Sequence, residues 1–293
     1  MSATALALVL AAALLHASWN LVAKRAGGGN HFVLLGAAFV SLLWAPLALW
    51  VGIAAVAQLG AREWAVLAAS ALIHVLYFRT LLHGYSVADL TVVYPVARGS
   101  GPLLTSLGAV ALLGERLTLA SAAGAVAVVG GVFLIAGGTR LWRRAHDPGS
   151  RQALRRGVVW GALTGFFIAG YSIVDGYAVK VLLLSPILVD YVGNLLRVPV
   201  MLPFALRDRR GFRQALRSQW KPALVVATLG PASYVMVLYA LTMAPLSHVA
   251  PAREVSMLFA ALMGGHLLGE GDRALRVAGA VAIALGVAAL ALG

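Results

Sequence analysis

The stretch LTVVYPVARGSGPLLTSLGAVALLGE, from Leu90 to Glu115, determines how we interpret the rest of the chain. It is apolar enough to cross a membrane, yet Arg98 lies near its middle, between Pro95 and Pro102. A charged side chain is costly in hydrocarbon unless it faces a protein interior or a wet cavity, where it usually marks function. We therefore expect Arg98 to point into a bundle of membrane helices.

The composition is that of a protein that crosses a membrane several times. Hydrophobic residues make up 61% of the 293 residues and charged residues only 11%, with a mean hydropathy of +0.90, whereas about 25% of a soluble domain is charged. The net charge of +13 does not indicate nucleic-acid binding, because the basic residues lie in short loops between apolar runs. The chain has no cysteine, which excludes disulfides and thiolate metal sites.

Ten apolar runs are long enough to cross a bilayer, which takes about 20 residues each. Because lipid cannot satisfy backbone hydrogen bonds, each run is expected to be a helix. The sequence thus predicts an all-α membrane protein. The predicted spans are 3–23, 31–54, 64–82, 88–113, 118–137, 157–179, 184–206, 221–243, 247–269 and 274–292.

The two halves of the chain match when the numbering is shifted by 155 residues. At this offset Arg98 falls on Arg253, and Gly114-Glu115 falls on Gly269-Glu270. Since each half holds five spans, an odd number, the second half must enter the membrane from the opposite side. Such inverted repeats enclose a central cavity with the substrate site at midplane. The predicted units are a first five-helix repeat at 1–138, a basic linker at 139–156 and a second five-helix repeat at 157–293.

The basic residues of the predicted loops gather on one face of the membrane. The loops after the odd-numbered spans hold 17 of them, whereas the other face holds only Arg62, Arg116 and Lys180. By the positive-inside rule, the richer face is cytoplasmic. The linker 139–156 is therefore predicted to be cytoplasmic and both termini periplasmic, in the inner membrane of a bacterium.

The candidate site starts at the fourth and ninth spans. Tyr94 and Arg98 share one stripe of the fourth span, and Arg253 and Glu254 hold the equivalent place in the ninth. Prolines and glycines beside them predict broken helices, whose free backbone groups suit a polar ligand. Two interpretations stay open. The arginines bind substrate or form a gate, or each pairs with a buried acid and only locks helices together.

Polar and aromatic side chains on other spans complete the candidate site. On the first and sixth spans they suit the wall of a pocket for an amphipathic solute, or else anchor the helices at the interface. The histidine of the third span can carry protons near neutral pH, although a lone histidine is more often a satisfied polar group. The residues are His16, Trp19 and Asn20 with Tyr171 and Asp175, and His74, Tyr77 and Phe78 with Tyr234 and Tyr239.

The fifth and tenth spans carry small residues instead of polar ones. Such stripes let helices approach closely, either within the monomer or across a homodimer. The stripe residues are Ala123, Ala127 and Gly131, repeated as Ala278, Ala282 and Gly286.

Other chemistries find little support in the sequence. No nucleotide-binding loop or metal motif is present, so we expect neither a cofactor nor a metal, and no enzyme. One alternative of another class is an intramembrane serine hydrolase that uses Ser100, which lies between Gly99 and Gly101 but has no evident histidine partner.

This architecture resembles the EamA-type ten-helix members of the drug/metabolite transporter superfamily over the whole chain. The residues that carry the resemblance are His16-Ala-Ser-Trp19-Asn20, Tyr94-Pro95 with Arg98, Leu113-Gly-Glu115 and Leu268-Gly-Glu270. The resemblance implies a secondary transporter that exports small metabolites through a central cavity by alternating access. It also implies termini in the cytoplasm, the opposite of the charge count.

The substrate class follows from one departure from related proteins. Four-helix relatives that export cationic drugs carry a glutamate in their first helix, and this chain has no acid there. With arginines inside the spans, a zwitterion or carboxylate fits better, which favours amino acids. The tyrosine and tryptophan content is compatible with the aromatic amino-acid exporters. Within transport, a sugar-phosphate or nucleotide-sugar exchanger and a drug exporter remain alternatives.

Overall fold

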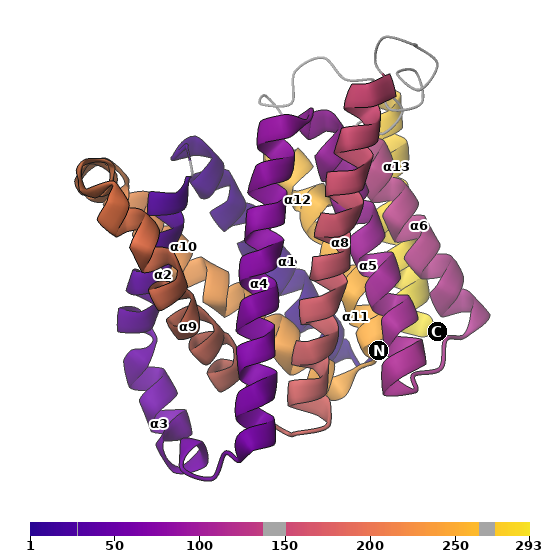
Figure 1. The fold of residues 1–293 in the computed structure, drawn as a ribbon. Coiled ribbons are helices and arrows are strands. Elements are labelled where there is room, and N and C mark those ends of the chain that lie inside the picture. Colours follow the sequence, from indigo (N-terminus) through magenta and orange to yellow (C-terminus); the bar gives the residue numbers. More distant parts are fainter. Residues whose placement is uncertain (28, 137–150, 264–272) are drawn as a thin grey trace.

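The structure is a computed structural model that describes residues 1–27, 29–136, 151–263 and 273–293. These residues form a bundle of helices, with no strand among them (Figure 1). Seven of the described helices are long and apolar enough to cross a membrane, and a bent pair makes an eighth span. The all-α membrane fold predicted from the sequence is confirmed.

The first half of the chain follows the predicted spans, with one interruption. The second span is not one helix but two, α2 and α3, which are bent by 51° relative to each other. The fifth span, α6, has only 17 residues. The helices are α1 (Ala3–Arg25), α2 (Asn30–Leu43), α3 (Ala45–Val56), α4 (Ala61–Val87), α5 (Leu90–Leu113) and α6 (Leu119–Ile135).

The second half has long helices and one broken span. The predicted ninth span is divided into α11, a 3₁₀ turn η2 and α12, and its predicted end at 264–269 lies outside the described residues. The elements are α8 (Arg151–Lys180), α9 (Pro186–Arg207), α10 (Arg209–Met243), α11 (Leu246–Ala252), η2 (Arg253–Val255), α12 (Ser256–Met263) and α13 (Arg273–Leu292).

The prediction of a broken fourth span was wrong, because α5 runs unbroken through Pro95 and Pro102. A proline in a membrane helix is tolerated where neighbouring groups compensate for the lost backbone bond. The ninth span does break after Pro251. This proline cannot donate to the carbonyl of Ser247, and the hydroxyl of Ser106 on α5 donates to that carbonyl instead, at 3.1 Å.

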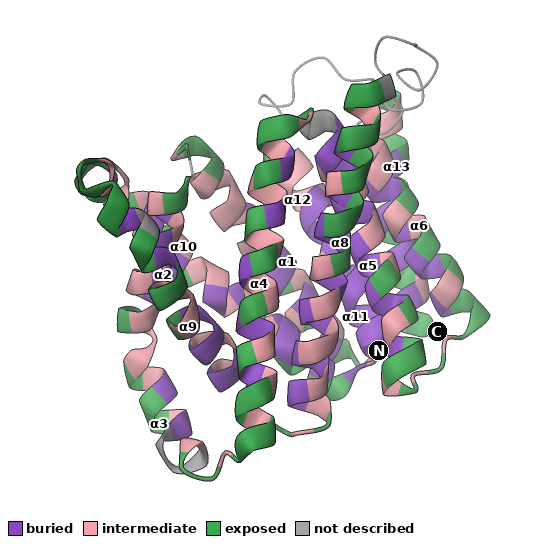
Figure 2. Ribbon diagram, in the orientation of Figure 1, coloured by how far each residue is buried: buried purple, intermediate pink, exposed green. Residues whose placement is uncertain are grey.

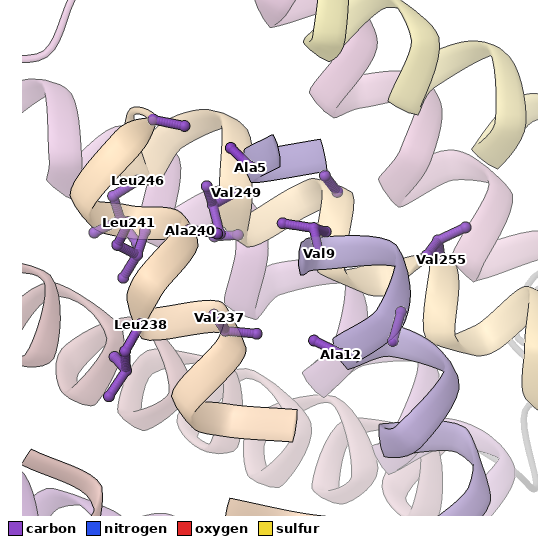
Figure 3. Close-up of a cluster of buried hydrophobic side chains, with 14 of the residues drawn as sticks. Ala5, Val9, Ala12, Val237, Leu238, Ala240, Leu241, Leu246, Val249 and Val255 are labelled. Atoms are coloured by element: carbon purple, nitrogen blue, oxygen red, sulfur yellow. The ribbon is translucent and has the colours of Figure 1, made fainter. Parts of the chain in front are cut away.

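The helices of the two halves pack against each other rather than forming separate bundles. In Figure 1, α6 and α13 lie together on one side, and α2, α3 and α9 lie on the other. Between these groups, α1 packs along α10 and α4 packs along α8. Buried residues line the inside of the bundle and exposed ones its outside (Figure 2). Figure 3 shows the core where α1 meets α10 and α11, with Val9, Leu238 and Val249 among its labelled side chains.

Glycines decide how closely α6 and α13 approach. A Cβ on Gly131 would lie 2.5 Å from the carbonyl oxygen of Gly279, and one on Gly124 would lie 2.7 Å from that of Gly286. Real Cβ atoms do not come that close to a backbone oxygen, so only glycine fits these positions. The small-residue stripe is therefore used within one chain.

A second glycine row, which the sequence analysis did not identify, joins α8 to α5. Gly157, Gly161 and Gly165 recur every four residues on α8 and face α5. A Cβ on Gly161 would lie 2.9 Å from the carbonyl oxygen of Val93. This close contact supports α5 along its length and is consistent with its unbroken path.

Both termini lie at the same end of the bundle (Figure 1). The amino group of Met1 donates to the carbonyl oxygen of Ala291 at 2.7 Å. This position of the termini is consistent with the predicted repeats, because two units of five spans with opposite orientation begin and end on the same side of a membrane.

The Gly114-Glu115 turn does more than connect two helices. Gly114 has φ of 68°, the left-handed region that favours glycine. The N-cap of the following helix is Thr118, not Glu115. The carboxylate of Glu115 instead accepts hydrogen bonds from Lys180 at 2.8 Å and from the amides of Leu246 and Ser247 at 2.7 and 2.8 Å. The equivalent turn at Gly269-Glu270 lies outside the described residues.

Candidate functional site

The break in the ninth span places two opposite charges inside the bundle. Glu254, in η2, is 1% exposed, and its Oε1 accepts a hydrogen bond from Arg98 of α5 at 3.4 Å. The other guanidinium nitrogen of Arg98 lies 3.2 Å from Nε2 of His16 on α1. Three separate elements thus meet at Arg98, and the interior position predicted for this residue is observed.

The contact between His16 and Arg98 indicates which nitrogen of the His16 imidazole is protonated. A guanidinium has only donors, so Nε2 of His16 must accept, and its proton is assigned to Nδ1. His16 is therefore neutral in this arrangement. Trp19 packs its ring edge-on against His16 at 4.9 Å. Tyr94 lies with its ring 5.7 Å from the Arg98 guanidinium and donates its hydroxyl to the sulfur of Met257 at 3.0 Å.

A matching contact exists in the second half of the chain. Arg253 donates to the hydroxyl of Tyr171 at 3.5 Å, and these residues are the partners of Arg98 and His16 at the 155-residue offset. Both pairs are separated by 82 positions in the sequence. The two arginines therefore have equivalent neighbours on the first and sixth spans.

The equivalence ends at the acid. Glu254 pairs with Arg98, whereas the residue that corresponds to Glu254 in the first half is Gly99. Among the described residues, Arg253 makes no salt bridge, and it donates to the Tyr171 hydroxyl at the limit of hydrogen-bond distance. Arg98 thus contacts an acid directly, whereas Glu254 and Asp175 act on the charge of Arg253 from beyond salt-bridge distance.

An aromatic layer surrounds the second arginine. The His74 ring stacks on Tyr171 at 4.0 Å, and the Tyr171 and Tyr234 rings lie 6.4 Å apart. Tyr77 contacts Tyr171 edge-on at 5.6 Å. The hydroxyl of Tyr234 donates to Oδ2 of Asp175, which is 1% exposed, and Oδ1 of Asp175 has no hydrogen-bond partner. Within this layer, Tyr234 is therefore hydrogen-bonded to an acid, Asp175, and Tyr171 to a cation, Arg253.

A small pocket with a cavity volume of about 10 Å³ lies beside this layer. Its polar wall consists of Ser172, Tyr234 and Arg253, and the rest is apolar. The walls come from α8, α10, α11 and η2, so in this conformation the pocket lies within the second half. It has room for about one water molecule, so a larger solute enters only when the helices around it move apart.

Other candidates lie outside these contacts. Ser100 donates its hydroxyl to Val96 of its own helix at 2.7 Å and lies against Gly165 of α8. No histidine among the described residues is hydrogen-bonded to Ser100. Asn20 donates to the carbonyl of His16 at 2.8 Å, and Tyr239 is 38% exposed on the outside of α10.

The sequence places a third arginine, Arg197 of α9, within an apolar span, as it does Arg98, although Arg197 is not among the candidate site residues. Its guanidinium lies 5.9 Å from the Phe78 ring and donates to the Asn194 side chain at 3.2 Å. The Nε atom of Arg197 is buried without a partner. The described residues hold no group of three histidines or acids that could bind a metal.

Comparisons with known proteins identify the kind of fold. Residues 155–292 match the model of a family described as the EamA-like transporter family. A crystal structure described only as that of a protein superposes with a TM-score of 0.76 and 17% identity, over 100% of this chain and 98% of the other. At that identity the likeness shows the fold alone. No curated protein matches the chain.

Proposed function

We propose that the chain is a multi-pass membrane transporter that exports amino acids or similar small metabolites, since residues 155–292 match the model of the EamA-like transporter family. One observation carries the substrate class. Arg98, Glu254, Arg253 and Asp175 form a set of two positive and two negative charges inside the bundle, and Arg253 lines a pocket. A neutral zwitterion matches such a set, because each of its ends meets an opposite charge.

We also infer that transport occurs by alternating access between two inverted repeats, 1–138 and 157–293, joined by the linker 139–156. The paired contacts of His16 with Arg98 and of Tyr171 with Arg253 support this relation, as does the meeting of the termini. Rocking of one repeat against the other would expose the site to each side in turn. Since the small residues of α6 and α13 contact each other within the chain, the proposed transport unit is a monomer.

One contact argues against the alternative of a serine hydrolase. The hydroxyl of Ser100 is held by its own helix, which does not suit a nucleophile that needs an adjacent base.

Efflux from proteoliposomes tests the proposal. Vesicles that contain the purified protein are loaded with one radiolabelled amino acid at a time, for each of the twenty. We expect at least one amino acid to leave these vesicles faster than it leaves protein-free vesicles. Arg98→Ala should lower that flux by about tenfold or more, because it leaves Glu254 buried without its cation. Ser100→Ala and Tyr239→Phe serve as controls and should keep the wild-type rate. Flux of no amino acid contradicts the proposed substrate class, and hydrolytic activity lost in Ser100→Ala would favour the enzyme.

A further inference from the structure

The two arginines of the repeat are equivalent in sequence and different in their surroundings. Arg98 has Glu254 at 3.4 Å, and Arg253 has Gly99 at the corresponding position of the first half. A cation inside a membrane bundle is stabilised by a nearby anion. Among the described residues no carboxylate forms a salt bridge with Arg253, although Glu254 and Asp175 act on its charge from further away.

Arg253 also lines the pocket beside the aromatic layer, whereas Arg98 is not among the residues of its wall. We propose that Arg253 binds the carboxylate of the transported solute, which takes the place beside Arg253 that Glu254 takes beside Arg98. This inference rests on the proposed function and names the group of the substrate that the site recognises.

The second end of the substrate follows from Asp175. Its Oδ1 is buried and has no hydrogen-bond partner, while its Oδ2 is held by Tyr234, a residue of the pocket wall. A buried carboxylate oxygen without a donor is costly, and an ammonium group would satisfy it. The hydroxyl of Tyr171 contacts Arg253, and the hydroxyl of Tyr234 contacts Asp175. Since the two tyrosine rings lie 6.4 Å apart, they connect the positive and the negative side chain. The site therefore recognises an α-amino acid by both its ends.

The rest of the pocket wall indicates which kind of substrate side chain the site would prefer. Val237, Leu238, Leu241, Leu246 and Val249 line the pocket away from the charges. These groups favour an apolar side chain and offer no partner to a charged one. We expect leucine-like amino acids to be bound better than acidic or basic ones.

Three related solutes separate the two ends of the site. L-leucine carries both charges, leucinamide lacks the carboxylate, and 4-methylpentanoate lacks the ammonium group. Their transport is measured in proteoliposomes with the wild type, Arg253→Gln, Asp175→Asn and the control Tyr239→Phe. Binding of each solute is measured separately from the rise in melting temperature of the detergent-solubilised protein, so that a variant that folds but does not transport still gives a result.

For L-leucine, Arg253→Gln is expected to raise KM by about 10- to 100-fold, the usual effect of losing a hydrogen bond to a charged group. The same variant should change the KM of leucinamide by less than about threefold. Asp175→Asn should raise the KM of leucine by about tenfold or more and leave that of 4-methylpentanoate within about threefold of the wild type. Arg253→Lys, which keeps the charge, should lie between the wild type and Arg253→Gln.

The outcomes distinguish this inference from the function on which it rests. If wild-type protein transports leucine and Arg253→Gln leaves its KM and its binding unchanged, the carboxylate site is elsewhere and the inference is wrong, while the transport function stands. Equal losses for leucine and leucinamide in Arg253→Gln would show a structural effect and would also overturn it. If no amino acid is transported or bound by the wild type, the proposed substrate class itself is wrong.

Discussion

At the scale of single residues, charge balance explains why the interior of the bundle is stable. Arg98 and Glu254 lie on elements that are far apart in the sequence, and their side chains are 16% and 1% exposed. Removing one member of a buried pair costs more than the pair contributes, because a charge is left unpaired. Variants of Arg98 and Glu254 can therefore test whether the two buried charges contribute to stability together or independently.

Glu254→Gln is expected to destabilise the protein by about 3 kcal/mol, since it leaves the Arg98 guanidinium without its anion. The double variant Arg98→Gln with Glu254→Gln should be more stable than Glu254→Gln alone, because it removes both charges. Thermal unfolding in one detergent, read by circular dichroism and by tryptophan fluorescence, measures both effects. Additive losses in the double variant would mean that the two side chains do not interact.

The same scale shows what a sequence can reveal about a site. An arginine inside an apolar span is recognisable from the sequence alone, and Arg98 and Arg253 were found in this way. Which acid neutralises which arginine depends on contacts between α5 and η2, which are 156 residues apart. The exposure of Tyr239 was not predictable either, because Tyr234 and Tyr239 are both in α10 and only the packing decides which one faces inward.

At the scale of elements, the sequence predicted where helices lie better than where they break. The predicted spans agree with the described helices to within a few residues at most ends, because the length of an apolar run is set by bilayer thickness. Proline alone did not predict a break. α5 contains two prolines and stays helical, while the span with Pro251 breaks at Arg253. The outcome depends on neighbours such as the α8 glycines and Ser106, which only the fold brings close.

The connection after α5 is held to two other elements by one carboxylate. Burial of Glu115 raises its pKa, but hydrogen bonds from Lys180, Ser247 and Leu246 together outweigh burial, so its pKa lies below the ordinary value. A group of this kind stabilises the folded state above its unfolded pKa and loses that contribution as the pH falls through its folded pKa. The stabilisation by Glu115 is therefore complete at neutral pH and is lost only in acid.

Glu115→Gln is expected to lower the stability at pH 7 by about 2 kcal/mol, because the amide keeps only one oxygen to accept hydrogen bonds and loses the ion pair with Lys180. The difference in melting temperature between the variant and the wild type should shrink as the pH is lowered below the ordinary pKa of a glutamate. Melting curves in detergent from pH 7 to pH 3 measure this difference. A gap that is constant over the whole range would show that the charge of Glu115 does not stabilise the fold.

At the scale of the whole molecule, the offset of 155 residues relates two contacts as well as two stretches of sequence. His16 contacts Arg98, and the equivalent Tyr171 contacts Arg253. The offset could not predict these contacts, nor that α1 packs on α10 and α4 on α8, because an internal repeat does not say which surfaces meet. The equivalence ends at Gly99 and Glu254, where only the second half has an acid.

The distribution of charge predicts which way the molecule is oriented in the membrane. The first part of α10, 209–221, carries Arg209, Arg213, Arg217 and Lys221 at spacings of four, all exposed, and none of them forms a salt bridge among the described residues. With 35 residues, at about 1.5 Å each, α10 is longer than the roughly 30 Å of hydrocarbon, so its basic start extends beyond it. Such a segment favours the cytoplasmic side, where anionic lipids attract it.

Because the chain has no cysteine, single cysteines can report which side each face occupies. Ser218→Cys lies in the basic segment, and Leu183→Cys lies in the connection after α8, 81% exposed and near Lys180. In intact bacterial cells, a membrane-impermeant maleimide should label Leu183→Cys at once and Ser218→Cys only after the inner membrane is opened. The reverse pattern would place the termini in the cytoplasm, which the resemblance to other transporters implies. In that case the 17-to-3 distribution of basic loop residues would not determine the orientation of the chain in the membrane.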